Sequence, residues 1–262
     1  MNVGCDFSFQ MINFFVLGHT YNYVISDSIF HIIYLEVKIV TRTKLCDRVL
    51  PNYTKGEEIF HTLSHFAGAV FGIVALLTCL MASITKQNTW GIVSSIIYGS
   101  SLILLYTMSS VYHGLPKGMA KKVLQIIDHC TIYLLIAGTY TPVMLCAVRP
   151  VSSAWAWTIM GLVWGCALIA ATLTAIDLKK YAKFSMVCYI GMGWCVILAF
   201  KPTVQAVPMA GLLWLLFGGI SYTVGAILYG LGKKHRYMHS IFHVFVVAGS
   251  VLQYIAILFY VL

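Results

Sequence analysis

The sequence predicts an all-α integral membrane protein, a bundle of seven transmembrane helices. Its 262 residues are 60% hydrophobic and only 10% charged, with a mean hydropathy of +0.86, so polar side chains are too few to enclose a water-soluble core. Seven stretches each hold about 20 mostly apolar residues, enough for a helix to cross a hydrocarbon layer of roughly 30 Å. Runs such as LIAATLTAI do not alternate polar and apolar residues, as the strands of a membrane barrel would.

The first three predicted spans carry polar motifs near their ends. The first, 62–85, begins within EEIFHTLSHFAG, and the second, 89–115, ends in SSVYHG. The third, 123–148, begins within LQIIDHCTIY and contains GTYTP. Pro142 in that segment predicts a helix kink that packs against other helices or lines a cavity.

The last four predicted spans are 153–176, 181–200, 207–232 and 239–262, and the loops between the spans leave no room for a soluble domain. Most of the eight cysteines lie inside spans, without a CxxC pair. We interpret them as small buried hydrophobic side chains.

Residues 1–56 are predicted to form an N-terminal extension, cytoplasmic or interfacial, before a membrane domain at 57–262. Asp6, Asp27 and Glu36 interrupt its apolar pieces, so no run reaches spanning length. The first basic residue is Lys38, too late for the positive region that begins a signal peptide. Two interpretations stay open: an amphipathic interfacial segment, or an extension that results from a misassigned start codon.

The basic residues predict a cytoplasmic N-terminus and a non-cytoplasmic C-terminus. Fourteen of the 17 Lys and Arg residues lie before the first span or in the loops after the second, fourth and sixth spans, and short loops rich in these residues stay on the cytoplasmic side. A basic inner face against anionic lipid accounts for the net charge of +9 without a nucleic-acid partner. We therefore expect a multi-pass protein of the plasma membrane, in contact with membrane lipids.

With this orientation, polar residues of three spans fall at one depth in the inner leaflet. They are Ser109 and His113 of the second span, Asp128 of the third, and His239 and His243 of the seventh. Asp128 is the only acidic residue set inside a predicted span. A charge in the bilayer costs about 2.5–3.5 kcal/mol on insertion scales, so this carboxylate needs a partner or a water-filled cavity. A structural hydrogen bond to a neighbouring helix is the alternative.

The histidine spacing predicts a metal site. Residues four apart on a helix differ by roughly 40° of rotation and about 6 Å of rise, so His239 and His243 present their rings to one side. His113, from a facing helix, is the candidate third ligand. Three imidazoles with the fourth position left to water are a usual arrangement in a catalytic zinc site. Interfacial histidines that merely reach toward water are the alternative.

The remaining histidines receive other interpretations. His129 points about 100° away from the preceding carboxylate, and His235 lies among basic residues, so we expect both to be solvated. His65 lies at the level of the predicted site and is a candidate partner of its ligands. We expect His61 and Glu58 just outside the membrane, in a solvated first turn whose acidic residues the helix dipole favours.

In this order the motifs resemble those of the hemolysin III family, over about residues 55 to 262. That family is related to the progestin and adipoQ receptors and, more distantly, to alkaline ceramidases. The motifs are Glu58 to His65, S-x-x-x-H at Ser109 to His113, the third-span Asp128, AGTYTP, and H-x-x-x-H at His239 to His243.

The resemblance implies an inner-leaflet zinc held by three histidines, with an aspartate engaging the zinc-bound water and a serine nearby. Residue by residue these are His113, His239 and His243 for the zinc, then Asp128 and Ser109. The sequence departs from the family at His61 and Ser64, where members often carry Asn and Thr, and in its long N-terminal region. Neither position belongs to the implied ligands.

The function we expect is zinc-dependent hydrolysis of a lipid-like amide or ester. Zinc held by neutral imidazoles lowers the pKa of bound water to around 7 and polarises a carbonyl group. Asp128 would orient that water and accept its proton, and Ser109 would support Asp128 or the developing oxyanion. Three alternatives stay open: a membrane-lytic, pore-forming protein, a receptor or sensor with a structural zinc, and a transporter, although transporter sites usually lie near the midplane.

Overall fold

All regular structure in the computed structural model is helical over the residues it describes, 42–232 and 235–262. Seven helical stretches there are long and apolar enough to cross a membrane, which confirms the predicted fold class. They lie within Leu50–Leu262, one of two units into which the chain divides, the other being Met1–Val49. Residues 1–41 of the predicted extension lie outside the described residues.

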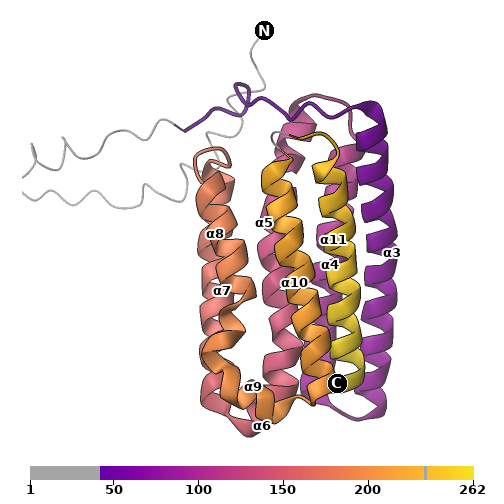
Figure 1. Cartoon of the computed structure of the whole chain (residues 1–262), viewed down its shortest axis with the longest axis vertical. Helices are drawn as coiled ribbons and strands as arrows, with labels where there is room; N and C mark the ends of the chain where they lie inside the picture. Colours follow the sequence, from indigo (N-terminus) through magenta and orange to yellow (C-terminus); the bar gives the residue numbers. More distant parts are fainter. Residues whose placement is uncertain (1–41, 233–234) are drawn as a thin grey trace, which may run out of the picture. The chain divides into compact units, whose positions relative to one another are not determined.

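The spans follow the predicted order, and three of them consist of more than one helical element. They are α3 (Lys55–Thr85); α4 (Thr89–Gly114); α5 (Met119–Pro142), η1 (Val143–Val148) and α6 (Arg149–Val151); α7 (Ser153–Ile176); α8 (Ala182–Gly193), η2 (Cys195–Ala199) and α9 (Phe200–Ala206); α10 (Met209–Leu231); and α11 (Met238–Ala256) with η3 (Ile257–Val261) (Figure 1).

Helix α3 begins seven residues earlier than predicted, because a capping box fixes its start. The backbone N–H of Thr54 donates to Glu57 Oε2 at 2.9 Å, and the N–H of Glu57 donates to Thr54 Oγ1 at 3.4 Å. This reciprocal pair satisfies backbone donors that the first helical turn leaves free. The helix therefore includes Glu58 and His61, which were expected just outside the membrane.

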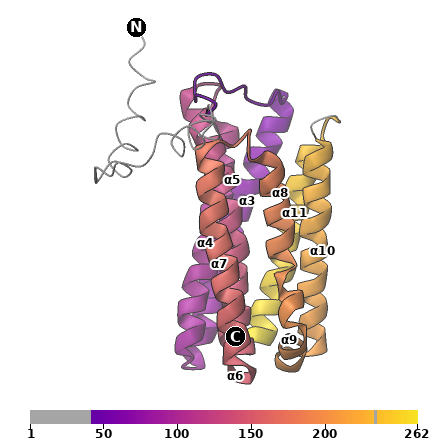
Figure 2. The same cartoon turned by 90° about the vertical axis from the view of Figure 1, so that its left-hand side faces the viewer.

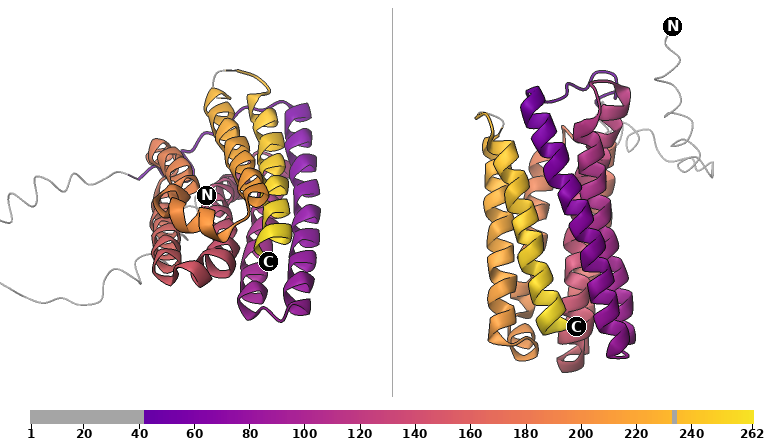
Figure 3. Two further views of the ribbon diagram at one scale, coloured as in Figure 1. Left: turned by 60° about the horizontal axis from the view of Figure 1, so that its bottom comes forward. Right: turned by 90° about the vertical axis from the view of Figure 1, so that its right-hand side faces the viewer.

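The helices of this unit pack in a ring. Along the chain α3 packs against α4, α4 against α5, α5 against α7 and α7 against α8, while α11 packs against both α10 and α3 (Figures 1 and 2). The first and last spans are therefore neighbours, as Figure 3 shows. Large apolar side chains such as Phe66, Ile169 and Val187 are more than half exposed, which suits helices surrounded by lipid.

Helices α3 and α4 approach closely at glycines. A Cβ atom on Gly99 would lie 2.7 Å from Leu76 Cα, and one on Gly72 would lie 3.1 Å from the Ile103 backbone nitrogen. Small residues at such crossings let helix backbones approach each other inside a membrane. Deeper in the bundle, the hydroxyl of Ser250 on α11 lies 2.6 Å from that of Tyr106 and 2.7 Å from that of Tyr222, which ties α4 and α10 to α11.

The fifth span is interrupted between α8 and α9. Pro202 has no N–H to donate to the carbonyl four residues earlier, which favours a break in the helix before it. Tyr140 of α5 binds two backbone groups at the end of α8 and the start of η2: its hydroxyl donates to the Gly193 carbonyl at 2.9 Å and accepts from the Val196 N–H at 2.9 Å. Such rescue by a neighbouring helix is what allows irregular backbone at membrane depth.

Two smaller predictions also have outcomes. Pro142 ends α5, and the chain continues as the π-helix η1, Val143–Val148, so the backbone does change geometry where the kink was predicted. The cysteines within the described residues are buried or partly buried, which agrees with their interpretation as small hydrophobic side chains.

Candidate metal centre

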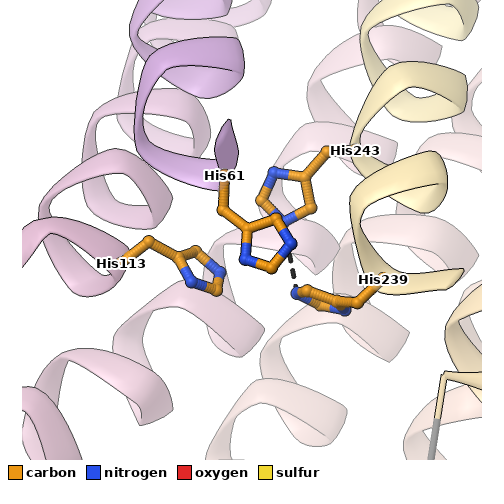
Figure 4. Close-up of side chains that lie close together, drawn as sticks. All are labelled: His61, His113, His239 and His243. Atoms are coloured by element: carbon orange, nitrogen blue, oxygen red, sulfur yellow. Dashed lines mark hydrogen bonds between the residues drawn. The ribbon is translucent and has the colours of Figure 1, made fainter. Parts of the chain in front are cut away.

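Four buried histidines gather where α3 and α11 begin and α4 ends. They are His61 of α3, His113 of α4, and His239 and His243 of α11. One ring nitrogen of each lies within 4.8 Å of the others, and none of the four side chains is more than 9% exposed. Figure 4 shows the His61 ring lying among the other three.

The structure brings together the three predicted ligands, His113, His239 and His243, from two helices that are far apart in the sequence. It corrects the expectation for His61 and Glu58. His61 is fully buried and belongs to the cluster, because α3 starts early enough to carry its ring into the bundle. Glu58 contacts the cluster directly, and the predicted solvated turn is therefore wrong for both residues.

Glu58 connects His113 to a buried lysine. Its Oε2 lies 2.7 Å from His113 Nδ1, and its Oε1 lies 2.7 Å from Lys121 Nζ. The same ammonium donates to the carbonyl oxygens of His113 at 3.1 Å and Leu115 at 2.9 Å. A metal-binding histidine usually gives its second ring nitrogen to a carboxylate or carbonyl, which fixes the ring and strengthens the ligand. Glu58 occupies that position for His113.

Two serines hold other rings of the cluster. Ser240 Oγ lies 2.8 Å from His61 Nε2, and Ser64 Oγ lies 3.4 Å from His243 Nδ1. Within the described part of the chain, His61 Nδ1 and His113 Nε2 have no hydrogen-bond partner although both are buried. His61, His113 and His243 thus each have one paired ring nitrogen, and the second nitrogen of His61 and of His113 remains available.

Two further aromatic rings cover the cluster. Tyr53 stacks on His239, with ring centroids 4.9 Å apart and planes at 16°. His65 stacks on His243 at 3.8 Å and 27°, so it contacts a predicted ligand as proposed from the sequence. Burial, reinforced by nearby acidic groups, raises the pKa of the Tyr53 phenol above its ordinary value. Its hydroxyl therefore stays neutral beside the histidines.

A cavity of about 180 Å³ begins beside the cluster. Side chains of α4, α5, α8, α10 and α11 line it, and most of the lining is apolar. Its wall on α11 runs from His239 to Gln253, a rise of roughly 21 Å along a helix. His239 and His243 belong to this wall, so two members of the cluster face the enclosed space.

Asp128 and Ser109 face the same cavity. Asp128 is only 14% exposed, and its Oδ2 lies 3.7 Å from His129 Nδ1. Asp128 is not one of the four residues whose ligand atoms lie within 4.8 Å of one another. It therefore shares the cavity wall with His239 and His243 without belonging to the cluster.

The expected solvation of His129 is wrong, and that of His235 is confirmed. The His129 ring is 15% exposed and lies in the cavity wall. Its Nδ1 lies 2.8 Å from the Gln125 carbonyl oxygen and its Nε2 lies 3.1 Å from the Tyr229 hydroxyl. His235 is exposed. The next residue after Asp128 on α5 points about 100° further round the helix. In this bundle that direction faces Tyr229 of α10 rather than solvent.

Comparison with known proteins assigns the sequence to a family. The family described as "Haemolysin-III related" matches residues 53–254. The chain belongs to this family. The matched residues include all four histidines of the cluster, together with Glu58, Ser109 and Asp128.

Named members of the haemolysin-III family, and a more distant protein, are similar over most of their length. The chain is 37% identical to Hemolysin-3 of Bacillus cereus, over 79% of this chain and 92% of the relative. It is 37% identical to the Hemolysin-3 homolog of Bacillus subtilis, over 79% and 96%. It is 25% identical to the human Monocyte to macrophage differentiation factor, over 75% and 82%.

The cluster fits the zinc that the resemblance to the haemolysin-III family implies. Imidazole nitrogens are ordinary zinc ligands at 2.0–2.1 Å, which puts two ligands of a tetrahedral site about 3.4 Å apart. His239 Nε2 and His243 Nε2 are 3.2 Å apart. A buried nitrogen without a partner is costly, and a cation between the rings would remove this cost for His61 and His113. The four buried histidines are thus a possible metal site.

Proposed function

We propose that this haemolysin-III family protein is a zinc-dependent hydrolase that cleaves an amide or ester bond of a lipid-like substrate within the membrane. The observation that carries the proposal is a buried histidine cluster in the wall of a long apolar cavity, beside a carboxyl group that faces the same space. Zinc held by imidazoles lowers the pKa of bound water to about 7 and polarises a carbonyl. His113, His239 and His243 would hold it.

The cavity supports a substrate with a long hydrocarbon chain. Its apolar walls extend roughly 21 Å along α11 away from the histidines, which suits a chain that lies along the helices with its polar bond at the cluster. Such a chain would keep bulk water away from the reacting bond. Membrane lipids are the natural source, and the basic loops favour a cluster at the cytoplasmic side of the plasma membrane.

Asp128 is the proposed general base. Its carboxyl group faces the cavity beside the two wall histidines, where it can accept a proton from the attacking water and pass it to the leaving group. Ser109 faces the same cavity and would orient this carboxyl group through its hydroxyl. As the carbonyl oxygen gains negative charge, the same hydroxyl can turn to donate to it.

Metal-dependent turnover tests the proposal. Purified full-length protein in lipid vesicles is incubated with amide and ester lipids, first as prepared, then after removal of metal by a chelator, and finally after addition of zinc. We expect hydrolysis that the chelator abolishes and zinc restores. Failure of the metal-loaded protein to hydrolyse any of these lipids would exclude the hydrolase.

The Asp128→Asn variant tests the mechanism. An amide keeps the shape and hydrogen bonding of the side chain but cannot take up the proton, so turnover should fall by roughly 10²–10⁴, the usual contribution of general acid–base catalysis. Zinc content should stay at the wild-type level, measured by metal analysis of the same sample. Turnover that survives this substitution would keep the enzyme but assign the base to another residue.

A receptor or sensor with a structural zinc is the second candidate, and the fourth imidazole favours it. Structural zinc sites are closed by four protein ligands, whereas catalytic sites keep a position open. Zinc retained without lipid turnover would support this alternative. The Bacillus relatives carry the name Hemolysin-3, and release of dye from vesicles by the purified protein would favour a membrane-lytic function instead.

A further inference from the structure

We infer that His61 is a fourth ligand of the metal and competes, from within the protein, for the coordination position that water or substrate needs. Metal binding by His61 does not depend on the proposed hydrolase activity. The effect of His61 on lipid turnover rests on that proposed function.

The inner nitrogen of His61 is available for coordination. Its side chain is completely buried, and Nδ1 has no hydrogen-bond partner among the described residues. The ring lies 4.5 Å from His113, 4.8 Å from His239 and 4.6 Å from His243, measured between ring centroids. The other three rings lie 4.8–5.4 Å from one another, so His61 is at least as close to each of them as they are to one another (Figure 4).

Ser240 selects the form of His61 that can bind a metal. Its Oγ lies 2.8 Å from His61 Nε2. If Nε2 carries the ring proton and donates it to this hydroxyl, Nδ1 holds a lone pair for the metal. Ser240 directly follows His239 on α11, so the helix that supplies two ligands also orients His61. This is the outer contact that metal-binding histidines commonly make.

The start of α3 is held against the start of α11, which fixes His61 beside the two α11 ligands. Glu57 accepts a hydrogen bond from the Tyr237 N–H at 3.1 Å, and its carboxylate lies 4.0 Å from Arg236 Nε. The widest separation in the cluster, 4.8 Å, exceeds a tetrahedral ligand spacing by only about 1.4 Å. Small side-chain rotations can close this difference while the helices stay in place.

Four imidazoles would complete a tetrahedral shell. A further ligand must then expand the coordination to five or displace an imidazole, whereas a three-histidine shell has a free position. His61 would therefore hold the metal tightly and slow the entry of water or substrate.

X-ray absorption at the zinc edge tests the coordination directly, because it counts imidazoles without any need for activity. The full chain is compared with His61→Ala, with Ser240→Ala, which keeps His61 but removes its orienting hydroxyl, and with His235→Ala, an exposed histidine outside the cluster. We expect four imidazoles per zinc in the wild type and His235→Ala, and three in His61→Ala. Zinc affinity should fall roughly 10–100-fold in Ser240→Ala and further in His61→Ala.

Three imidazoles in the wild type, with an unchanged count and affinity in His61→Ala, would overturn the inference. If His61→Ala does not fold, the affinity of Ser240→Ala decides, and an affinity equal to that of the wild type would count against the inference. At saturating zinc, turnover per metal should rise in His61→Ala, because a position has opened. Four imidazoles without lipid turnover in any variant would support His61 as a ligand and reject the proposed hydrolase, so the two failures are distinguishable.

Discussion

At the scale of single residues, Glu58 links a histidine of the cluster to a buried lysine. It contacts both His113 and Lys121 at 2.7 Å. In Glu58→Gln the shape is kept and the negative charge is lost, so His113 becomes a weaker ligand and Lys121 loses its counter-ion. We expect zinc affinity to fall by about 10–100-fold, measured by competition with a metal-sensitive dye. Lys117→Ala, an exposed substitution in the adjoining loop, should leave the affinity unchanged.

The three histidines predicted from the sequence should each be necessary for metal binding. We expect about one zinc per chain in the wild type. In His113→Ala, His239→Ala and His243→Ala the zinc affinity should fall at least as much as in His61→Ala, because each also removes a nitrogen ligand. Metal analysis of purified protein measures this, with His235→Ala as the matched control. Undiminished zinc in all three variants would remove the metal from this cluster.

The sequence predicted part of this site and missed His61 and Glu58. The i and i+4 spacing of His239 and His243 is local, so a single helix determines it. His61 was misplaced because counting apolar residues began the first span at 62, whereas the Thr54–Glu57 capping box begins it at Lys55. The pattern T-x-x-E was available in the sequence as a helix start. The rotation that turns His61 inward depends on packing against α4 and α11, which no local pattern records.

At the scale of helices, the α3–α4 crossing should be sensitive to one added methyl group. In Gly99→Ala the new Cβ would lie 2.7 Å from Leu76 Cα, so the two backbones must separate. Overpacking of this kind costs about 1–3 kcal/mol. We expect a lower unfolding temperature in detergent, together with weaker zinc retention, because His61 and His113 are on these two helices.

Gly161→Ala is the matched control for that crossing. Nothing lies within 4 Å of a Cβ at Gly161 in α7, and alanine is favoured over glycine inside a helix by roughly 1 kcal/mol. Its unfolding temperature should be equal to that of the wild type or slightly higher. Equal effects of both substitutions would mean that the crossing at Gly99 tolerates the added methyl group.

The interrupted fifth span shows that apolar stretches predict the number of spans but not the tertiary contacts that stabilise a break within one. Seven apolar stretches were sufficient to predict seven spans, but the fifth continues beyond the predicted end at residue 200, through η2 and α9 to Ala206. Pro202 indicated a break. What makes the break tolerable is the hydroxyl of Tyr140, which comes from α5 and binds both sides of the interruption. That contact is tertiary, so a pattern within the span could not reveal it.

At the scale of the whole molecule, the distribution of basic residues makes a prediction about orientation. The loops after α4, α7 and α10, at the end of the spans that carries the histidine cluster, are richer in Lys and Arg than the loops at the opposite end, and such loops stay in the cytoplasm. A reporter fused after Leu262 should therefore be active on the non-cytoplasmic side, and one placed in the 177–181 loop on the cytoplasmic side. The opposite readout would move the cluster to the outer leaflet, and the proposed substrate pool with it.

The neighbouring positions of α3 and α11 also constrain the biosynthesis of the protein. The contact between Ser64 and His243 joins residues 179 positions apart, and His239 and His243 lie in the seventh span. During translation the earlier helices are inserted while half of the cluster has not yet been made. A chain stalled before α11 lacks two of the four imidazoles and the helix that closes the ring, so any metal that the complete cluster binds must enter after the seventh helix has been made.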